Sequence, residues 1–188
     1  MMLNPALILI GVNVVMFFVT LAPDLIDHLS LLPGQYFTEQ PWGLITSMFV
    51  HGSFYHIFAN MFTLYFFGSF LLRLVGDRWF WLIYLAGGIL GGVFYVVLAP
   101  LTPPMYPAIG ASGAVFALAG TLVILAPRLR VYIFPIPVPL QLWIAVIGGF
   151  LLISFFPNVA WQAHLGGLLF GMAAAYYIKR RGGRRVYF

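Results

Sequence analysis

The sequence predicts an all-α fold, a polytopic membrane bundle of six transmembrane helices that forms a single domain over residues 1–188. Hydrophobic residues make up 63% of the chain and charged residues only 7%, whereas a soluble domain carries about 25% charged residues. Six apolar stretches follow one another without a long polar linker. Because one soluble core could not bury so much apolar surface, we expect lipid to be the main solvent.

The six apolar stretches are at or slightly below the length of about 20 residues with which a helix crosses the hydrocarbon. They are Pro5–Leu21, Phe54–Leu72, Trp79–Leu98, Ser112–Ala126, Leu140–Phe156 and Ala163–Ile178. The first is predicted to be a membrane helix and not a removable signal peptide. Residues 1–21 have no basic start and no small-residue cleavage site.

The basic residues predict the orientation of these helices. They are Arg73, Arg78, Arg128, Arg130, Lys179, Arg180, Arg181, Arg184 and Arg185. All nine follow the second, fourth or sixth stretch, and basic flanks are typical of the cytoplasmic side. We therefore expect both termini in the cytoplasm and these three helices to run from outside to inside. Because the net charge of +5 lies on membrane flanks, we expect no nucleic-acid binding.

Two segments between the stretches are predicted to enter the protein or the membrane interface. Residues 22–53 hold many apolar side chains, and we expect Trp42 there to lie at headgroup depth. Residues 100–109 contain four prolines, which exclude a membrane helix. Irregular backbone at membrane depth has to be buried in protein or line a watery cavity. The sequence therefore predicts a cavity, open to the outside, in front of Ser112.

Polar side chains stand at the start of the even-numbered stretches, where they are costly in hydrocarbon unless they have a role. His56 lies 17 residues before Arg73, Ser112 lies 16 before Arg128, and His164 lies 15 before Lys179. At about 1.5 Å per residue, all three lie about 22–26 Å from the cytoplasmic boundary. We therefore expect them at one level, slightly below the outer surface.

These residue types suit acyl transfer, which needs a nucleophile, a base and donors for the oxyanion. Ser112 can attack and the neutral imidazole of His164 can take its proton. Asn60 Nδ2, a ring nitrogen of His56 and the Ser112 N–H can donate to the oxyanion. No Asp or Glu lies within a predicted helix, so we expect Phe116 to orient His164 by packing.

Small residues are predicted to bring the fourth and sixth helices together. Gly167 and Gly171 share a helix face with His164, and Gly113 begins a smooth stripe on the fourth helix. Each motif alone has a simpler interpretation. A serine among small residues and a Gly-x-x-x-Gly run are more often packing, and His56 with Asn60 could be one interhelical pair. His51 could serve only to tie down the outer segment.

In combination, these motifs resemble the rhomboid family over nearly the whole chain. They are His51-x-x-x-x-His56-x-x-x-Asn60, Gly110-Ala111-Ser112-Gly113 and Ala163-His164-x-x-Gly167-x-x-x-Gly171. Phe116 departs from the family pattern, in which tyrosine is common at this place.

The resemblance implies an intramembrane serine endopeptidase that cleaves membrane-anchored substrates near the outer leaflet. It implies Ser112 and His164 as a catalytic dyad. It also implies an oxyanion hole formed by His56, Asn60 and the Ser112 N–H, and substrate that enters sideways near the fifth helix. The length suggests the minimal prokaryotic form, an integral protein of the plasma membrane.

Other functions and partners follow from the same residues. The expected partners are transmembrane protein substrates and the lipid bilayer, without a cofactor or metal. A zinc site from His51, His56 and His164 is disfavoured because no carboxylate ligand or His-Glu-x-x-His accompanies them. A catalytically silent rhomboid-like protein that binds membrane segments and, less favoured, a small transporter stay open as alternatives.

Overall fold

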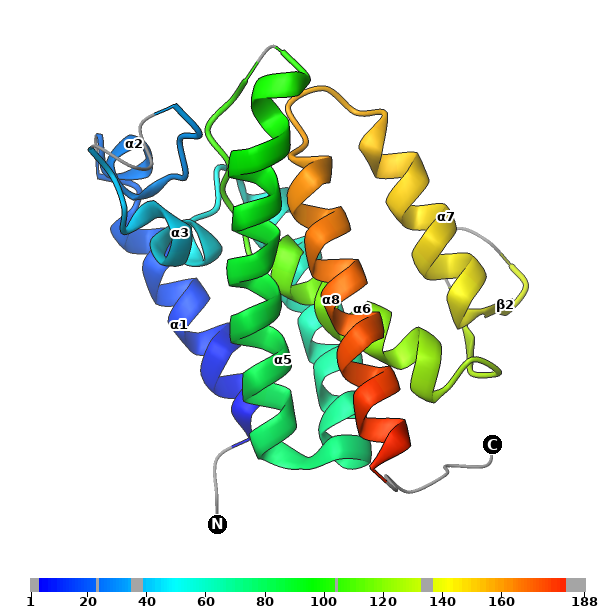
Figure 1. The fold of residues 1–188 in the computed structure, drawn as a ribbon. Coiled ribbons are helices and arrows are strands. Elements are labelled where there is room, and N and C mark those ends of the chain that lie inside the picture. Colours follow the sequence, from blue (N-terminus) through cyan, green and yellow to red (C-terminus); the bar gives the residue numbers. More distant parts are fainter. Residues whose placement is uncertain (1–3, 23, 35–38, 104, 133–136, 182–188) are drawn as a thin grey trace.

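The structure is a computed structural model that describes residues 4–22, 24–34, 39–103, 105–132 and 137–181. Over these residues the fold is all-helical apart from one short hairpin (Figure 1). The helices are α1 (Pro5–Val19), α2 (Leu25–Leu29), α3 (Gly43–Thr46), η1 (Ser47–Phe49), α4 (Phe54–Thr63), η2 (Leu64–Gly68), α5 (Ser69–Leu98), η3 (Ala99–Leu101), α6 (Ser112–Leu125), α7 (Leu142–Ser154) and α8 (Trp161–Arg180). The hairpin, which the sequence did not predict, pairs β1 (Arg130–Val131) with β2 (Leu140–Gln141).

Each of the six predicted apolar stretches contains a helix in the structure, although the fifth begins with the two residues of β2. α4, η2 and the first residues of α5 form one continuous helical segment, which includes a π-helical turn at η2. Gly76 then takes φ 77° and ψ 172°, a conformation that suits glycine, and the chain turns back. Among the described residues only Phe54–Leu101 is both long and apolar enough to cross a membrane; α1, α6 and α7 are apolar but shorter.

α6 lies in the interior and packs against α5 and α8, which also pack against each other, while α1 and α7 lie on opposite sides (Figure 1). Ala117, Leu118 and Leu122 on α6 are fully buried. A helix that is apolar all round belongs in the interior, and small residues on α6 let two neighbours approach it. Ser112, the first residue of α6, is thereby held inside the bundle.

Glycines set the contact between α6 and α8. A Cβ at Gly167 would overlap the Gly113 carbonyl oxygen, and a Cβ at Gly171 would overlap that of Ala117. On α6, a Cβ at Gly120 would meet the Leu168 carbonyl oxygen. The two backbones therefore touch along most of α6, as small residues allow in membrane bundles.

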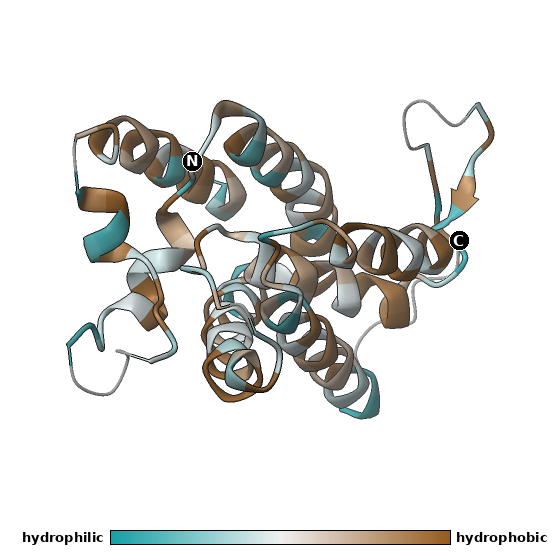
Figure 2. Cartoon of the chain, turned by 90° about the horizontal axis from the view of Figure 1, so that it is seen from above, coloured by the Kyte–Doolittle hydropathy of each residue, from teal (hydrophilic) through white to brown (hydrophobic). Residues whose placement is uncertain are grey.

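The outward faces of the outer helices are apolar. Phe18 on α1, Phe58 and Phe62 on α4, and Leu152 on α7 are all more than half exposed. Figure 2 shows that the helices are mainly hydrophobic and that hydrophilic residues gather mostly in loops and at helix ends. Soluble proteins seldom expose apolar surface on this scale, so this surface suits lipid.

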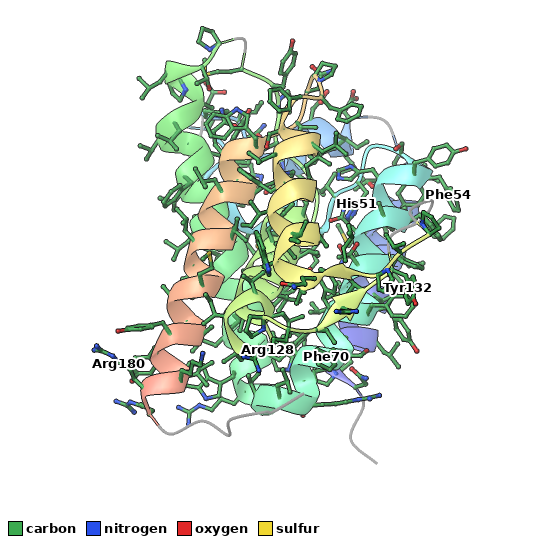
Figure 3. The ribbon with its side chains drawn as sticks, turned by 90° about the vertical axis from the view of Figure 1, so that its right-hand side faces the viewer. His51, Phe54, Phe70, Arg128, Tyr132 and Arg180 are labelled. Carbon is green, nitrogen blue, oxygen red and sulfur yellow. The ribbon has the colours of Figure 1, made fainter. Side chains whose placement is uncertain are left out.

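Two of the basic residues lie away from the residues that precede and begin α4 (Figure 3). Arg128 and Arg180 lie in the lower part of Figure 3, whereas His51 and Phe54 lie in the upper part. Two members of the predicted basic tail, Arg184 and Arg185, lie outside the described residues. His51 and Arg180, which belongs to the predicted basic tail, therefore lie at different levels of the bundle (Figure 3).

The segment from α2 to η1 lies beside the upper part of α5 and is held together by hydrogen bonds of its own (Figure 1). The indole N–H of Trp42 donates to the His28 carbonyl oxygen at 2.8 Å, and the Thr46 hydroxyl donates to that of Leu29 at 2.7 Å. A Cβ at Gly43 would overlap the Ser30 carbonyl oxygen. Glycine at position 43 therefore lets the segment close on itself.

We predict that Gly171→Ala lowers the free energy of unfolding by about 1–3 kcal/mol, because the new methyl group collides with the Ala117 backbone and separates α6 from α8. The measurement is thermal or denaturant unfolding of the protein in detergent. The matched control is Gly148→Ala on α7, where a Cβ would meet nothing within 4 Å. Because alanine favours a helix by about 1 kcal/mol over glycine, the control keeps or gains stability. Equal losses in both variants would contradict the contact described.

Candidate active site

Ser112 and His164 lie at the first turns of α6 and α8, where these helices are in contact. The Ser112 Oγ is 2.7 Å from the His164 Nε2. Ser112 is partly buried, while His164 is only 6% exposed. When the histidine is neutral with Nε2 unprotonated, the serine hydroxyl donates to it, and the pair has the geometry of a nucleophile with its base.

The His164 ring is oriented by aromatic packing. Phe116, one turn after Ser112, stacks on it with ring centroids 4.8 Å apart and an interplanar angle of 28°. Phe150 on α7 contacts the Phe116 ring edge-on at 5.9 Å. In the described part of the chain, the buried Nδ1 of His164 has no hydrogen-bond partner. The orientation of the imidazole therefore depends on Phe116, with Phe150 behind it.

The start of α6 offers backbone donors beside Ser112. The helix begins without a side-chain cap, and the first N–H groups of a helix have no partner within it. The helix dipole adds partial positive charge at this end. A negative oxygen near Ser112 would thus be stabilised by the backbone itself.

His56 faces the loop that leads to Ser112. Ser53 caps α4 by accepting from the His56 N–H at 3.2 Å, which places this histidine in the first turn. Gly110 takes φ 112°, and a Cβ there would approach the His56 Nε2. Only glycine combines this backbone conformation with this space. The structure therefore brings His56 next to Gly110, two residues before Ser112.

Asn60 lies one turn further along α4 and is only 6% exposed. Its Nδ2 donates to the His56 carbonyl oxygen at 2.9 Å, so the hydrogen bond that the structure gives this side chain stays within α4. An amide nitrogen carries two hydrogens, and the second can serve another acceptor.

His51, just before α4, attaches the Ser112 loop to the outer segment. Its Nε2 accepts from the Ala111 N–H at 3.4 Å, and its ring lies 4.9 Å from that of His56. Burial first, and the neighbouring His56 second, lower the pKa of His51 to about 3. The imidazole therefore stays neutral near neutral pH, and its Nε2 can keep accepting.

Sequence reasoning missed several groups that hold this loop. The Gly110 N–H donates to the Ser47 carbonyl oxygen at 2.8 Å, and Leu31 pairs with Ala108 through two backbone hydrogen bonds of 2.9 and 3.0 Å. Backbone partners leave no residue-type signal in a sequence. Phe150 was missed too, because nothing distinguishes it from the other apolar residues of α7.

The described histidines near Ser112 do not form a cluster of three ligands. Among the described residues, no group of three His, Asp or Glu side chains could hold an ion. The three histidines near Ser112 instead contact the loop, each other or the serine.

The chain also matches a known protein family. The family model of the Rhomboid domain matches residues 38–181, which include every candidate residue above. The chain belongs to the rhomboid family. Rhomboid proteins are membrane proteins, which fits the apolar outer surface of the bundle.

Individual rhomboid relatives match along much of the chain. Rhomboid protein 1, mitochondrial, of Saccharomyces cerevisiae is 31% identical over 92% of this chain. RHOMBOID-like protein 12, mitochondrial, of Arabidopsis thaliana is 38% identical over 75%, and the rhomboid protein YdcA of Bacillus subtilis is 31% identical over 77%. The chain spans about half the length of the first two (52% and 47%) and 70% of YdcA.

We predict that a serine-directed fluorophosphonate labels Ser112 of this rhomboid protein, because the hydroxyl is hydrogen-bonded to an imidazole that can take its proton. Peptide mass mapping identifies the labelled serine. His164→Asn should remove the labelling. The matched control is Ser154→Ala, because the Ser154 hydroxyl donates only to a carbonyl of its own helix, Phe150 O at 2.6 Å. Labelling that is spread over several serines would contradict a selectively activated Ser112.

Proposed function

We propose that this rhomboid protein is an intramembrane serine endopeptidase that hydrolyses peptide bonds of membrane-anchored substrates near the outer leaflet. The observation that carries the proposal is the 2.7 Å hydrogen bond between Ser112 Oγ and His164 Nε2 at the start of two touching helices. Acyl transfer needs a nucleophile whose proton has an acceptor within such reach.

In the proposed reaction, Ser112 Oγ attacks the scissile carbonyl carbon while His164 Nε2 accepts the hydroxyl proton. The oxyanion that forms takes hydrogen bonds from the Ser112 N–H, His56 and the second amide hydrogen of Asn60. The imidazolium then protonates the leaving amine, and an acyl ester stays on Ser112. Water attacks this ester with His164 again as the base, which releases the second product and restores the serine.

The pair works without a carboxylate in this proposal. A third residue usually holds the histidine in one orientation and tautomer. Here the stacked Phe116 ring supplies the orientation, supported by Phe150. His51, Gly110 and Gly113 have supporting roles, as they shape the loop and the start of α6. Gly167 and Gly171 act by letting α8 reach α6.

The proposal includes the placement of the protein in the membrane. We infer one domain over residues 1–188, with six spans and both termini in the cytoplasm of a prokaryotic cell. Arg128 and Arg180 lie at the level away from His51 (Figure 3), as the positive-inside rule requires for this orientation. The helices α1, α6 and α7 are shorter than the hydrocarbon is thick, and local thinning of the bilayer or flanking side chains would accommodate this mismatch. The partners are the lipid bilayer and transmembrane protein substrates.

We predict that the purified protein in liposomes cleaves a single-span test substrate, and that Ser112→Ala and His164→Ala each abolish cleavage while the protein stays folded. Substrate and product are separated by gel electrophoresis, and thermal unfolding reports the fold. Ser154→Ala should cleave like the wild type. Cleavage by none of the folded proteins, over several substrates and lipids, would favour the catalytically silent binding protein. Equal cleavage by all would contradict the assigned dyad.

We predict that Asn60→Ala slows cleavage by about 10²–10³-fold, because one oxyanion donor is lost. His56→Ala should slow it similarly. The measurement is kcat for the same substrate, with thermal unfolding as the check on the fold. Thr63→Ala is the matched control on α4, since the hydroxyl of the partly buried Thr63 donates to Ala59 O within its own helix. An unchanged rate in both Asn60→Ala and His56→Ala would overturn the oxyanion assignment.

A further inference from the structure

Thr121 is a fully buried polar side chain on α6, two to three turns below Ser112. Its Oγ1 lies 2.8 Å from the Ala117 carbonyl oxygen of its own helix and 3.0 Å from the Gly171 carbonyl oxygen of α8. One hydroxyl hydrogen is thus shared between the two helices. The reaction described above gives this residue no part, although it lies on the same interface as Ser112 and His164.

In the described part of the chain, three side-chain hydrogen bonds join α6 to α8. They are Ser112 to His164, Thr121 to Gly171 O, and Lys179 Nζ to Ile124 O at 3.3 Å. Lys179 is exposed, so water competes for its ammonium group. Of these three hydrogen bonds, two lie further along α6 than the proposed dyad. Only the one made by Thr121 is buried.

Apart from the stacking of Phe116 on His164 near the dyad, the glycine contacts of this interface are smooth. Gly167 rests on the Gly113 backbone and Gly171 on that of Ala117. Such contacts fix the distance between the helix axes, but dispersion has no direction along the axis. A slide of α6 along α8 by about 1 Å, in so far as it is directed along the line from Oγ to Nε2, would carry the Ser112 Oγ beyond hydrogen-bond range of the His164 Nε2. A misplacement of that size can cost about 10²-fold in rate.

We propose that Thr121 is a positioning residue that fixes the axial register of α6 on α8 and thereby holds Ser112 within reach of His164. The inference rests on the proposed function, because it assigns Thr121 a part in that reaction. A hydroxyl shared between Ala117 O and Gly171 O is directional, so it resists the slide that the glycines permit. Thr121 acts through the helices and does not touch the substrate.

The chain contains a matched control for this role. Thr63 on α4 donates to the carbonyl oxygen four residues earlier, at 2.8 Å, as Thr121 does. Thr63 is only partly buried, and in the described part of the chain its hydroxyl has no hydrogen bond to a second helix. Thr121→Val and Thr63→Val therefore remove the same intrahelical bond at similar volume, but only the first removes an interhelical one. Thr121→Ser keeps the hydroxyl and serves as the rescue.

We predict that Thr121→Val lowers both kcat on the test substrate and the rate of fluorophosphonate labelling at Ser112 by about 3- to 15-fold, the range of an interhelical hydrogen bond in membrane proteins. KM should not change, because the substrate does not contact Thr121. Thr121→Ser and Thr63→Val should stay close to the wild type. An equal loss in Thr63→Val, or none in Thr121→Val, would overturn the inference.

A second measurement reports the register without any enzymatic readout. The sequence has no cysteine, so spin labels can be attached after Leu125→Cys on α6 and Tyr176→Cys on α8. In Thr121→Val the distance distribution between the labels should broaden, while Thr121→Ser and Thr63→Val should keep that of the parent protein. A parent protein that neither labels nor cleaves would contradict the proposed function alone. An unchanged distribution in Thr121→Val would contradict the register role alone.

Discussion

The backbone contact between α6 and α8 is the constraint on which the rest of the structure depends. At Gly167 and Gly171 a single methyl group would strike a carbonyl oxygen of α6. Without this approach, Ser112 and His164 could not share a 2.7 Å hydrogen bond, because each stands on the first turn of its own helix. In lipid, helices associate through close packing and not through the exclusion of water. Small residues therefore stabilise the helix contact there, as apolar burial does in a soluble protein.

Close contact places two helices side by side, but the loop before α6 decides where Ser112 stands. That loop is attached at Ala108 to Leu31, at Gly110 to Ser47, and at Ala111 to His51. Two of these ties are between backbone groups, and all three reach the outer segment before α4. This segment therefore supports the candidate site, which explains why it is apolar and internally bonded and not a solvated loop.

The polar groups of the site are few, and the imidazole of His164 has a packing partner that orients it. The His164 ring stacks on Phe116, and Phe116 contacts Phe150 on α7, a helix at the edge of the bundle (Figure 1). The proposed chemistry thus joins a rigid centre, built from α5, α6 and α8, to a peripheral helix through two aromatic rings. A displacement of α7 would therefore change the orientation of the His164 imidazole through these two ring contacts.

The sequence by itself determined the helical class, the six apolar stretches and the residues of the candidate site, because apolar length and polar side chains in hydrocarbon are local signals. It also led to the rhomboid family, to which the chain belongs. Only the tertiary structure decided which groups meet: Phe150 behind Phe116, Ser47 O on Gly110, and Thr121 on Gly171 O. Such contacts depend on the register and rotation of whole helices, which many distant residues set together, so no short sequence pattern records them.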